Sequence, residues 1–133
     1  MSYLVDTDWV VDYLAGRTAV VQLLDELAPQ GLAISIITFI EVYEGIYHSR
    51  DPQGTEAIFR AFLQAVKVLS ITRTVARRTA RIRGYLRQQK LPIDHRAFDL
   101  VIAGTALAYD LTLITRNLRH YRDIPDLKLY QQN

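Results

Sequence analysis

The stretch Tyr3-Leu4-Val5-Asp6-Thr7-Asp8-Trp9 joins a short apolar run that favours β-structure to two carboxylates. In open α/β sheets, ligands bind in the crevice outside the carboxyl ends of the strands. A strand that ends at Asp6 would place this carboxylate at such an edge, so Asp6 is the first candidate for chemistry. The alternative is that Asp6 is a turn residue. For Asp8 we favour an N-cap role, because short acceptor side chains satisfy the free N–H groups of a first helical turn.

Apolar, β-branched stretches alternate along the rest of the chain with segments of helical periodicity. After the first strand, further strands are expected at residues 32–37, 68–71 and 111–114, and a fifth at a sheet edge over 127–130. Helices are expected at residues 9–15, 18–27, 38–48, 55–67, 72–90 and 98–109. Parallel strands need crossover connections, which are usually helices. The alternation predicts a three-layer α/β/α sandwich with a central, mainly parallel sheet.

The composition narrows the class of protein. The 133 residues fit one domain spanning 1–133, and 50% hydrophobic residues supply a substantial core. The net charge is only +2, so any affinity for nucleic acid must come from local clusters of basic side chains. The absence of cysteine excludes disulfides, thiolate zinc sites and cysteine nucleophiles. With no signal-peptide pattern and no apolar run of membrane-spanning length, we expect a cytoplasmic protein.

Three carboxylates stand in unusual positions: Asp6 after the first strand, Glu41 in the helix after the second, and Asp99 at the start of an apolar helix. A parallel sheet would bring all three to the same edge. Carboxylates gathered in one cleft repel one another unless a cation is present. Mg²⁺ and Mn²⁺ prefer oxygen ligands and lower the pKa of bound water, whereas a chain with no cysteine and three histidines is a poorer match for zinc.

Each acid alone has an ordinary explanation. Glu41 could pair with a basic side chain, and Asp99 could stabilise the start of its helix through the macrodipole. Taken together they favour a metal site, because Asp99 lies in an otherwise uncharged helix and Glu41 flanks an apolar helix face.

Four segments, at residues 4–9, 37–45, 98–107 and 113–118, resemble in sequence and order those of the PIN-domain ribonucleases, specifically the VapC toxins of bacterial toxin–antitoxin pairs. The resemblance spans essentially the whole chain. It implies a parallel sheet flanked by helices and an endoribonuclease activity that depends on Mg²⁺ or Mn²⁺. It also implies a homodimer and inhibition by a VapB-type antitoxin protein.

The resemblance carries over to individual residues. Asp6, Glu41 and Asp99 match the family's principal acidic positions, Thr7 and Thr115 match small hydroxyl positions near the metal, and Asn117 lies in the Thr-Arg-Asn segment that borders it. Asp6 and Asp99 are expected to ligate the cation, with Glu41 acting through water or orienting the attacking water.

One position departs from the family pattern. The family often continues Thr-Arg-Asn-x-Arg-Asp-Phe, whereas this chain has His120 in place of that aspartate. We therefore expect one well-bound cation rather than two.

Basic and aromatic side chains suggest where RNA and a partner bind. Arg116 and Arg119 adjoin the expected site and are candidates for phosphate contacts. The arginine-rich helix at residues 72–90 is either a track for phosphates or an ordinary solvated face, and the pattern does not separate the two. One group of aromatic and aliphatic residues belongs either to the core or to a groove for an antitoxin helix: Tyr43, Ile46, Tyr47, Phe59 and Phe62.

Parts of the sequence also fit two other functions. Asp6-Thr7-Asp8-Trp9-Val10 also fits the opening motif of haloacid-dehalogenase-like phosphatases, but the acidic pair that this family needs later in the chain is missing. His120 also raises the alternative of a catalytically impaired PIN-like module that binds RNA or a partner. Metal-dependent RNA cleavage separates this module from a nuclease.

Overall fold

The computed structural model describes residues 1–131. Its elements, in chain order, are β1 (Tyr3–Val5), α1 (Thr7–Leu14), α2 (Thr18–Leu27), η1 (Ala28–Gln30), β2 (Leu32–Ser35), α3 (Ile36–Tyr47), α4 (Pro52–Leu63), β3 (Val66–Leu69), α5 (Arg73–Gln88), α6 (Ala97–Ala108), β4 (Thr112–Ile114), η2 (Leu118–His120) and β5 (Lys128–Leu129).

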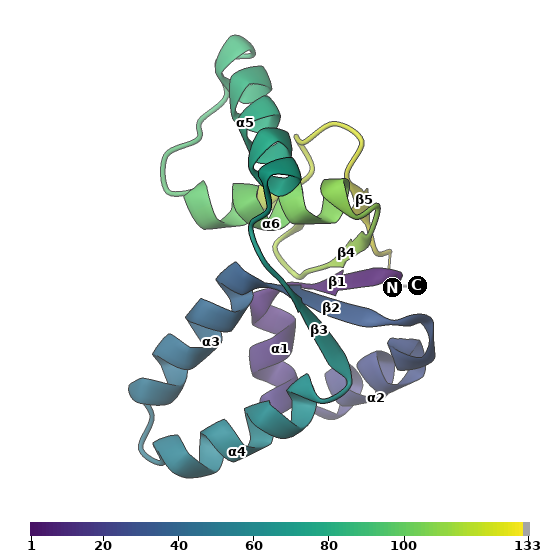
Figure 1. The fold of residues 1–133 in the computed structure, drawn as a ribbon, viewed down its shortest axis with the longest axis vertical. Coiled ribbons are helices and arrows are strands. Elements are labelled where there is room, and N and C mark those ends of the chain that lie inside the picture. Colours follow the sequence, from purple (N-terminus) through teal and green to yellow (C-terminus); the bar gives the residue numbers. More distant parts are fainter. Residues whose placement is uncertain (132–133) are drawn as a thin grey trace.

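The strands form one five-stranded sheet in the order β3-β2-β1-β4-β5, and every neighbouring pair is parallel. Strand β1 lies in the centre, where Leu4 pairs with Ala33 on one side and with Leu113 on the other. Helices α1–α4 cover one face of the sheet, and α5 and α6 cover the other (Figure 1). The predicted three-layer α/β/α sandwich is confirmed, and so is the short fifth strand at the sheet edge.

Each face of the sheet has its own hydrophobic core, because successive side chains of a strand point to opposite faces. Leu4 packs with residues of α5 and α6, whereas Val5 packs with residues of α1–α4. Leu113 and Ile114 divide between the two cores in the same way. The central strands are therefore buried on both sides, which explains why they read as continuous apolar runs.

Several predicted boundaries are wrong; helix α4, for example, spans Pro52–Leu63 rather than residues 55–67, because Asp51 caps it by accepting from the Gly54 N–H. Strand β2 ends at Ser35 rather than at residue 37, because the Ser35 side chain caps α3 by accepting a 3.0 Å hydrogen bond from the Ile37 N–H. Strand β3 begins two residues earlier than expected. Asp8 is not the cap of the first helix; Asp6 fills that position, and its side chain accepts from the Thr7 N–H at 2.8 Å.

Helices α5 and α6 pack closely at Gly104, whose absent side chain leaves room for Thr79. A Cβ atom at residue 104 would overlap the Thr79 hydroxyl. This contact holds α6 against α5, and α6 carries Asp99 in its first turn. Among the helices of residues 1–131, none has the length and apolar character that crossing a bilayer requires.

Candidate active site

Asp6 is the best-anchored side chain at the carboxyl edge of the sheet. It follows β1 directly, is only 4% exposed, and receives hydrogen bonds on both carboxylate oxygens. Oδ1 accepts from the Thr7 N–H at 2.8 Å, and Oδ2 accepts from the hydroxyls of Thr115 at 2.7 Å and Tyr121 at 3.1 Å. Donors from both ends of the chain therefore hold this carboxylate in one orientation.

Asp99 lies on the other side of Tyr121. The Tyr121 hydroxyl is 3.2 Å from Asp99 Oδ1, so one phenol bridges the carboxylates of Asp6 and Asp99. The second oxygen of Asp99 lies 3.0 Å from Nδ1 of His120. The histidine that replaces the family's further acid is thus in contact with Asp99.

Glu41 belongs to the same edge but has no direct hydrogen bond to Asp6 or Asp99. Its Oε1 accepts from the Thr7 hydroxyl at 2.7 Å, and the same hydroxyl lies 3.0 Å from Thr38 Oγ1. Because Thr7 immediately follows Asp6, one short segment supplies both the central acid and the group that holds Glu41.

Burial and neighbouring negative charges disfavour the ionised forms of Asp6 and Tyr121. Burial, followed by the negative charges of Asp8 and Asp99, raises the pKa of Asp6 to about 6 in spite of the hydrogen bonds from Thr115 and Thr7, which lower it. Burial, reinforced by the charges of Asp6 and Asp99, raises the pKa of the Tyr121 hydroxyl far above its usual range, so this group stays a hydrogen-bond donor.

The donor set at this edge suits a hard divalent cation. Mg²⁺ typically binds through one or two carboxylates and keeps several waters. Asp6 and Asp99 supply two such carboxylates, with Glu41 beyond Thr7. Within residues 1–131 no group of three His, Cys, Asp or Glu side chains is close enough to hold a metal ion by itself. The residues present fit a cation that is held by few protein ligands, and its charge would offset the repulsion between the carboxylates of Asp6 and Asp99.

Arg116 is already paired in this structure. The Arg116 guanidinium lies 2.6 Å from Asp12, and Asp12 also contacts Arg17 at 3.0 Å. The backbone N–H of Arg116 donates to the Asp8 carboxylate at 3.0 Å. Arg119, in contrast, is exposed and forms no ion pair with any residue among 1–131. Arg119 is therefore the freer of the two predicted phosphate contacts.

The sequence-based prediction missed Tyr121. A buried tyrosine normally finds a hydrogen-bond partner for its hydroxyl. The family motif often has phenylalanine at this position, so the additional hydroxyl of Tyr121 was the sequence signal for a polar role.

The ion pair between Arg96 and Asp123, at 2.7 Å, was also not anticipated. It occupies Asp123 and ties the segment after η2 to the start of α6.

A family model described as the PIN domain matches residues 3–126. The chain belongs to the PIN-domain family. The VapC-type ribonucleases within this family are similar over nearly the whole chain. Ribonuclease VapC19 of Mycobacterium tuberculosis is 35% identical, with 94% of this chain and 96% of that protein covered. The tRNA(fMet)-specific endonuclease VapC of Shigella flexneri is 27% identical, with 96% of each covered.

Solved structures extend the similarity to three dimensions. The PIN domain described here superimposes on a chain of VapBC2 from Rickettsia felis, solved bound to a DNA fragment from their promoter, with a TM-score of 0.89, 26% identity and full coverage of both chains. VapBC-1 from nontypeable Haemophilus influenzae gives a TM-score of 0.83 at 26% identity, with 98% of both chains covered. Both comparisons support the fold described above.

Proposed function

We propose that this VapC-type PIN domain is the metal-dependent endoribonuclease toxin of a toxin–antitoxin pair. The observation that carries the proposal is the pair of carboxylates, Asp6 and Asp99, bridged by Tyr121 at the carboxyl edge of the parallel sheet. Glu41 stands next to this pair through Thr7. The named ribonuclease relatives support RNA as the substrate.

Asp6 and Asp99 would hold Mg²⁺ or Mn²⁺. When bound, such a cation would offset the repulsion between the carboxylates, hold a phosphate oxygen and lower the pKa of a water molecule. Tyr121 and Thr115 fix the orientation of Asp6 Oδ2 by filling it with two hydrogen bonds, which leaves Oδ1 with its remaining lone pair free. His120 and Tyr121 orient Asp99 in the same way.

Glu41 is the proposed group that orients the attacking water. Thr7 fixes Oε1 of Glu41, and Oε2 has no hydrogen-bond partner among residues 1–131 and is free to accept a proton from water. Asn117, whose N–H donates to the Thr115 hydroxyl at 3.0 Å, supports Thr115 and through it Asp6. Arg119 is the proposed contact for an RNA phosphate, because it is exposed and has no ion-pair partner among residues 1–131.

Cleavage of a bulk RNA substrate in Mg²⁺ or Mn²⁺ by the wild type, Asp6→Asn and Asp99→Asn proteins tests this function. We expect both variants to lose cleavage. Asp110→Asn is the matched control, because Asp110 is an exposed acid paired with Lys128 away from this edge. Wild-type cleavage by both site variants would refute the assignment. Absent cleavage by the wild type would favour the impaired module, and cleavage that continues in EDTA would refute the metal dependence.

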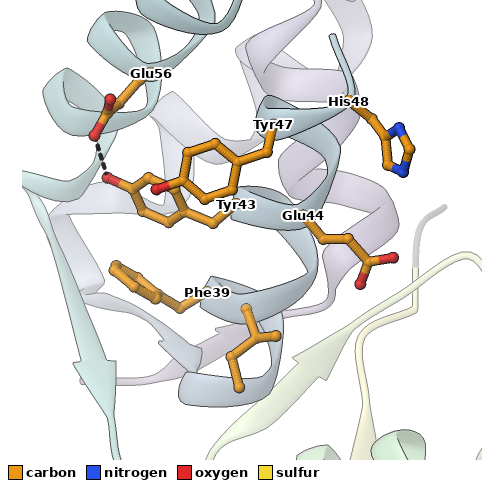
Figure 2. A pocket seen from close by; sticks show the side chains of 7 residues that line it. Phe39, Tyr43, Glu44, Tyr47, His48 and Glu56 are labelled. Carbon is orange, nitrogen blue, oxygen red and sulfur yellow. Dashed lines mark hydrogen bonds between the residues drawn. The ribbon is translucent and has the colours of Figure 1, made fainter.

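The antitoxin is proposed to dock on an apolar hollow beside α3. This hollow, of about 710 Å³, is lined by Phe39, Ile40, Tyr43 and Tyr47, with Glu44, His48 and Glu56 at its polar positions. Figure 2 shows the rings of Phe39, Tyr43 and Tyr47 along one side of α3, with the Tyr43 hydroxyl bonded to Glu56. Tyr47 is 72% exposed. An amphipathic helix would cover these rings.

The name VapBC of the structural neighbours supports a VapB-type partner, and the exposed aromatic rings are the reason to propose this surface for it. Of the aromatic and aliphatic residues considered for the groove, Ile46, Phe59 and Phe62 are buried and belong to the core. Co-expression of wild-type and Tyr47→Ser protein with a VapB-type antitoxin tests the surface; unchanged complex formation by the variant would place the antitoxin elsewhere.

A homodimer is also proposed, and light scattering of the purified protein measures it.

A further inference from the structure

Helix α5 carries six of the protein's sixteen basic residues and no acid. Its buried side faces α6 and the sheet, whereas Arg77, Arg78 and Arg81 are exposed. Within residues 1–131 no acidic side chain lies within ion-pair distance of any α5 arginine. The positive charge on this helix is therefore uncompensated by the fold, and it creates a local field that attracts polyanions.

Two adjacent hollows share Arg78 and Arg81. The first, of about 170 Å³, is polar and is completed by Thr74 and Arg77. The second, of about 290 Å³, is bordered by apolar side chains and by one acid, and its lining includes Ile82, Tyr85, Leu107, Pro125 and Asp126. Tyr85 is 38% exposed. A row of arginines thus runs beside an accessible aromatic ring, with both on the same helix.

This combination fits the two parts of a nucleotide. Arginine binds phosphate through its planar fork of N–H donors, and an aromatic face stacks on an unpaired base. An acidic peptide could form ion pairs with the arginines, but it has no planar base to stack on the Tyr85 ring. A duplex keeps its bases stacked inside the helix. We propose that the α5 surface, made of Arg77, Arg78, Arg81 and Tyr85, binds a single-stranded segment of the RNA substrate.

The surface lies within reach of the proposed catalytic edge. Pro125, which lines the second hollow, follows Tyr121 by four residues, so their Cα atoms are at most about 14 Å apart. In Figure 1, α5 crosses α6 on the side of the sheet opposite to α1–α4. Leu107, which also lines the second hollow, follows Asp99 by eight residues on α6, which is about 12 Å along the helix axis. A single strand that extends from α5 along α6 would therefore reach Asp99 on the same face of the sheet. The inference rests on the ribonuclease activity proposed above and adds where the substrate is held.

Fluorescence anisotropy of a fluorescein-labelled, single-stranded 20-nucleotide RNA of mixed sequence, recorded with the full chain in EDTA over a range of salt concentrations, tests this proposal. We expect Arg78→Gln/Arg81→Gln to weaken binding at least about tenfold and to lower the salt slope by about 1.4, since each phosphate contact contributes about 0.7 for single strands. Tyr85→Leu is expected to weaken binding about tenfold with an unchanged slope, because stacking releases no counterions.

The control is Arg50→Gln/Arg60→Gln, which removes the same charge from exposed positions beside and within α4, on the other face of the sheet. Affinity within twofold of wild type is expected for this control. Equal weakening by the two arginine pairs would overturn the proposal, because it would show that only net charge matters. Full displacement of the RNA by polyaspartate of equal charge would also overturn it in favour of an acidic protein partner.

Two further measurements distinguish a failure of the α5 proposal from a failure of the proposed ribonuclease function. Light scattering of Arg78→Gln/Arg81→Gln must give the wild-type mass; a loss of dimer would show that α5 is covered by a second copy and would overturn the proposal. In Mg²⁺, the α5 variants are expected to raise KM with an unchanged kcat. Wild-type cleavage that the α5 variants do not affect refutes the α5 surface alone, whereas absence of wild-type cleavage refutes the proposed function.

Discussion

Replacing Asp6 with asparagine should make the metal-free protein more resistant to unfolding at pH 8 than at pH 5, relative to wild type. Asp6 is 4% exposed, and its pKa is about 6 instead of 3.8. Asparagine has nearly the same shape and keeps an oxygen for the Thr7 N–H, but it carries no charge. The substitution therefore removes the buried carboxylate charge while it changes little of the packing.

The magnitude follows from linkage between protonation and folding. The folded state binds the Asp6 proton more tightly than the unfolded state, so the stability from this proton is fully present below about pH 3.8 and is lost as pH rises through about 6. At about 1.4 kcal/mol per pKa unit, ionised Asp6 costs the apo-protein about 3 kcal/mol at pH 8 and roughly half of that at pH 5. The free-energy gap between variant and wild type should therefore grow by about 1.4 kcal/mol between pH 5 and pH 8.

Urea unfolding followed by circular dichroism, with EDTA present at both pH values, measures this gap. Hydrogen bonds that asparagine cannot reproduce contribute equally at the two pH values and cancel in the comparison. Asp12→Asn is the matched control, since Asp12 is also buried but contacts Arg17 and Arg116. This control should lose stability at pH 8. A gap for Asp6→Asn that is the same at pH 5 and pH 8 would refute the reasoning that burial strains the Asp6 charge.

Three further substitutions probe the site and the core. Tyr121→Phe keeps the ring but removes the donor shared by two carboxylates, so Mn²⁺ affinity by calorimetry should fall about 10- to 100-fold; unchanged affinity would show that the phenol does not position them. Thr7→Val frees Glu41 and should lower kcat by up to about 100-fold at unaltered RNA affinity, and a change in KM alone would contradict the role given to Glu41. Phe59→Ala empties a fully buried ring site and should cost about 3–5 kcal/mol in urea unfolding, with a loss below 1 kcal/mol indicating a collapsed cavity.

The α/β/α architecture was predictable because its signals are local. Apolar runs bounded by turn residues predict buried strands, and the need for crossovers makes the sheet parallel. The boundaries were less predictable, since they depend on single side chains. The Ser35 hydroxyl ends β2 by capping α3, and Asp6 rather than Asp8 caps α1. Short acceptors only two residues apart are equivalent in sequence, and the backbone geometry at the strand end selects between them.

The sequence by itself determined that Asp6, Glu41 and Asp99 lie at one edge, because parallel strands share a carboxyl end and each acid stands just beyond such an end or on an adjoining helix. The tertiary structure alone decided how they are connected. Tyr121 reaches Asp6 across 115 residues, and Thr7 joins Glu41 across 34. Hydrogen bonds of this kind depend on the packing of α6 and of the segment after β4 against β1. Strand and helix patterns fix the edge at which a side chain emerges, whereas only close packing fixes the atom that it meets.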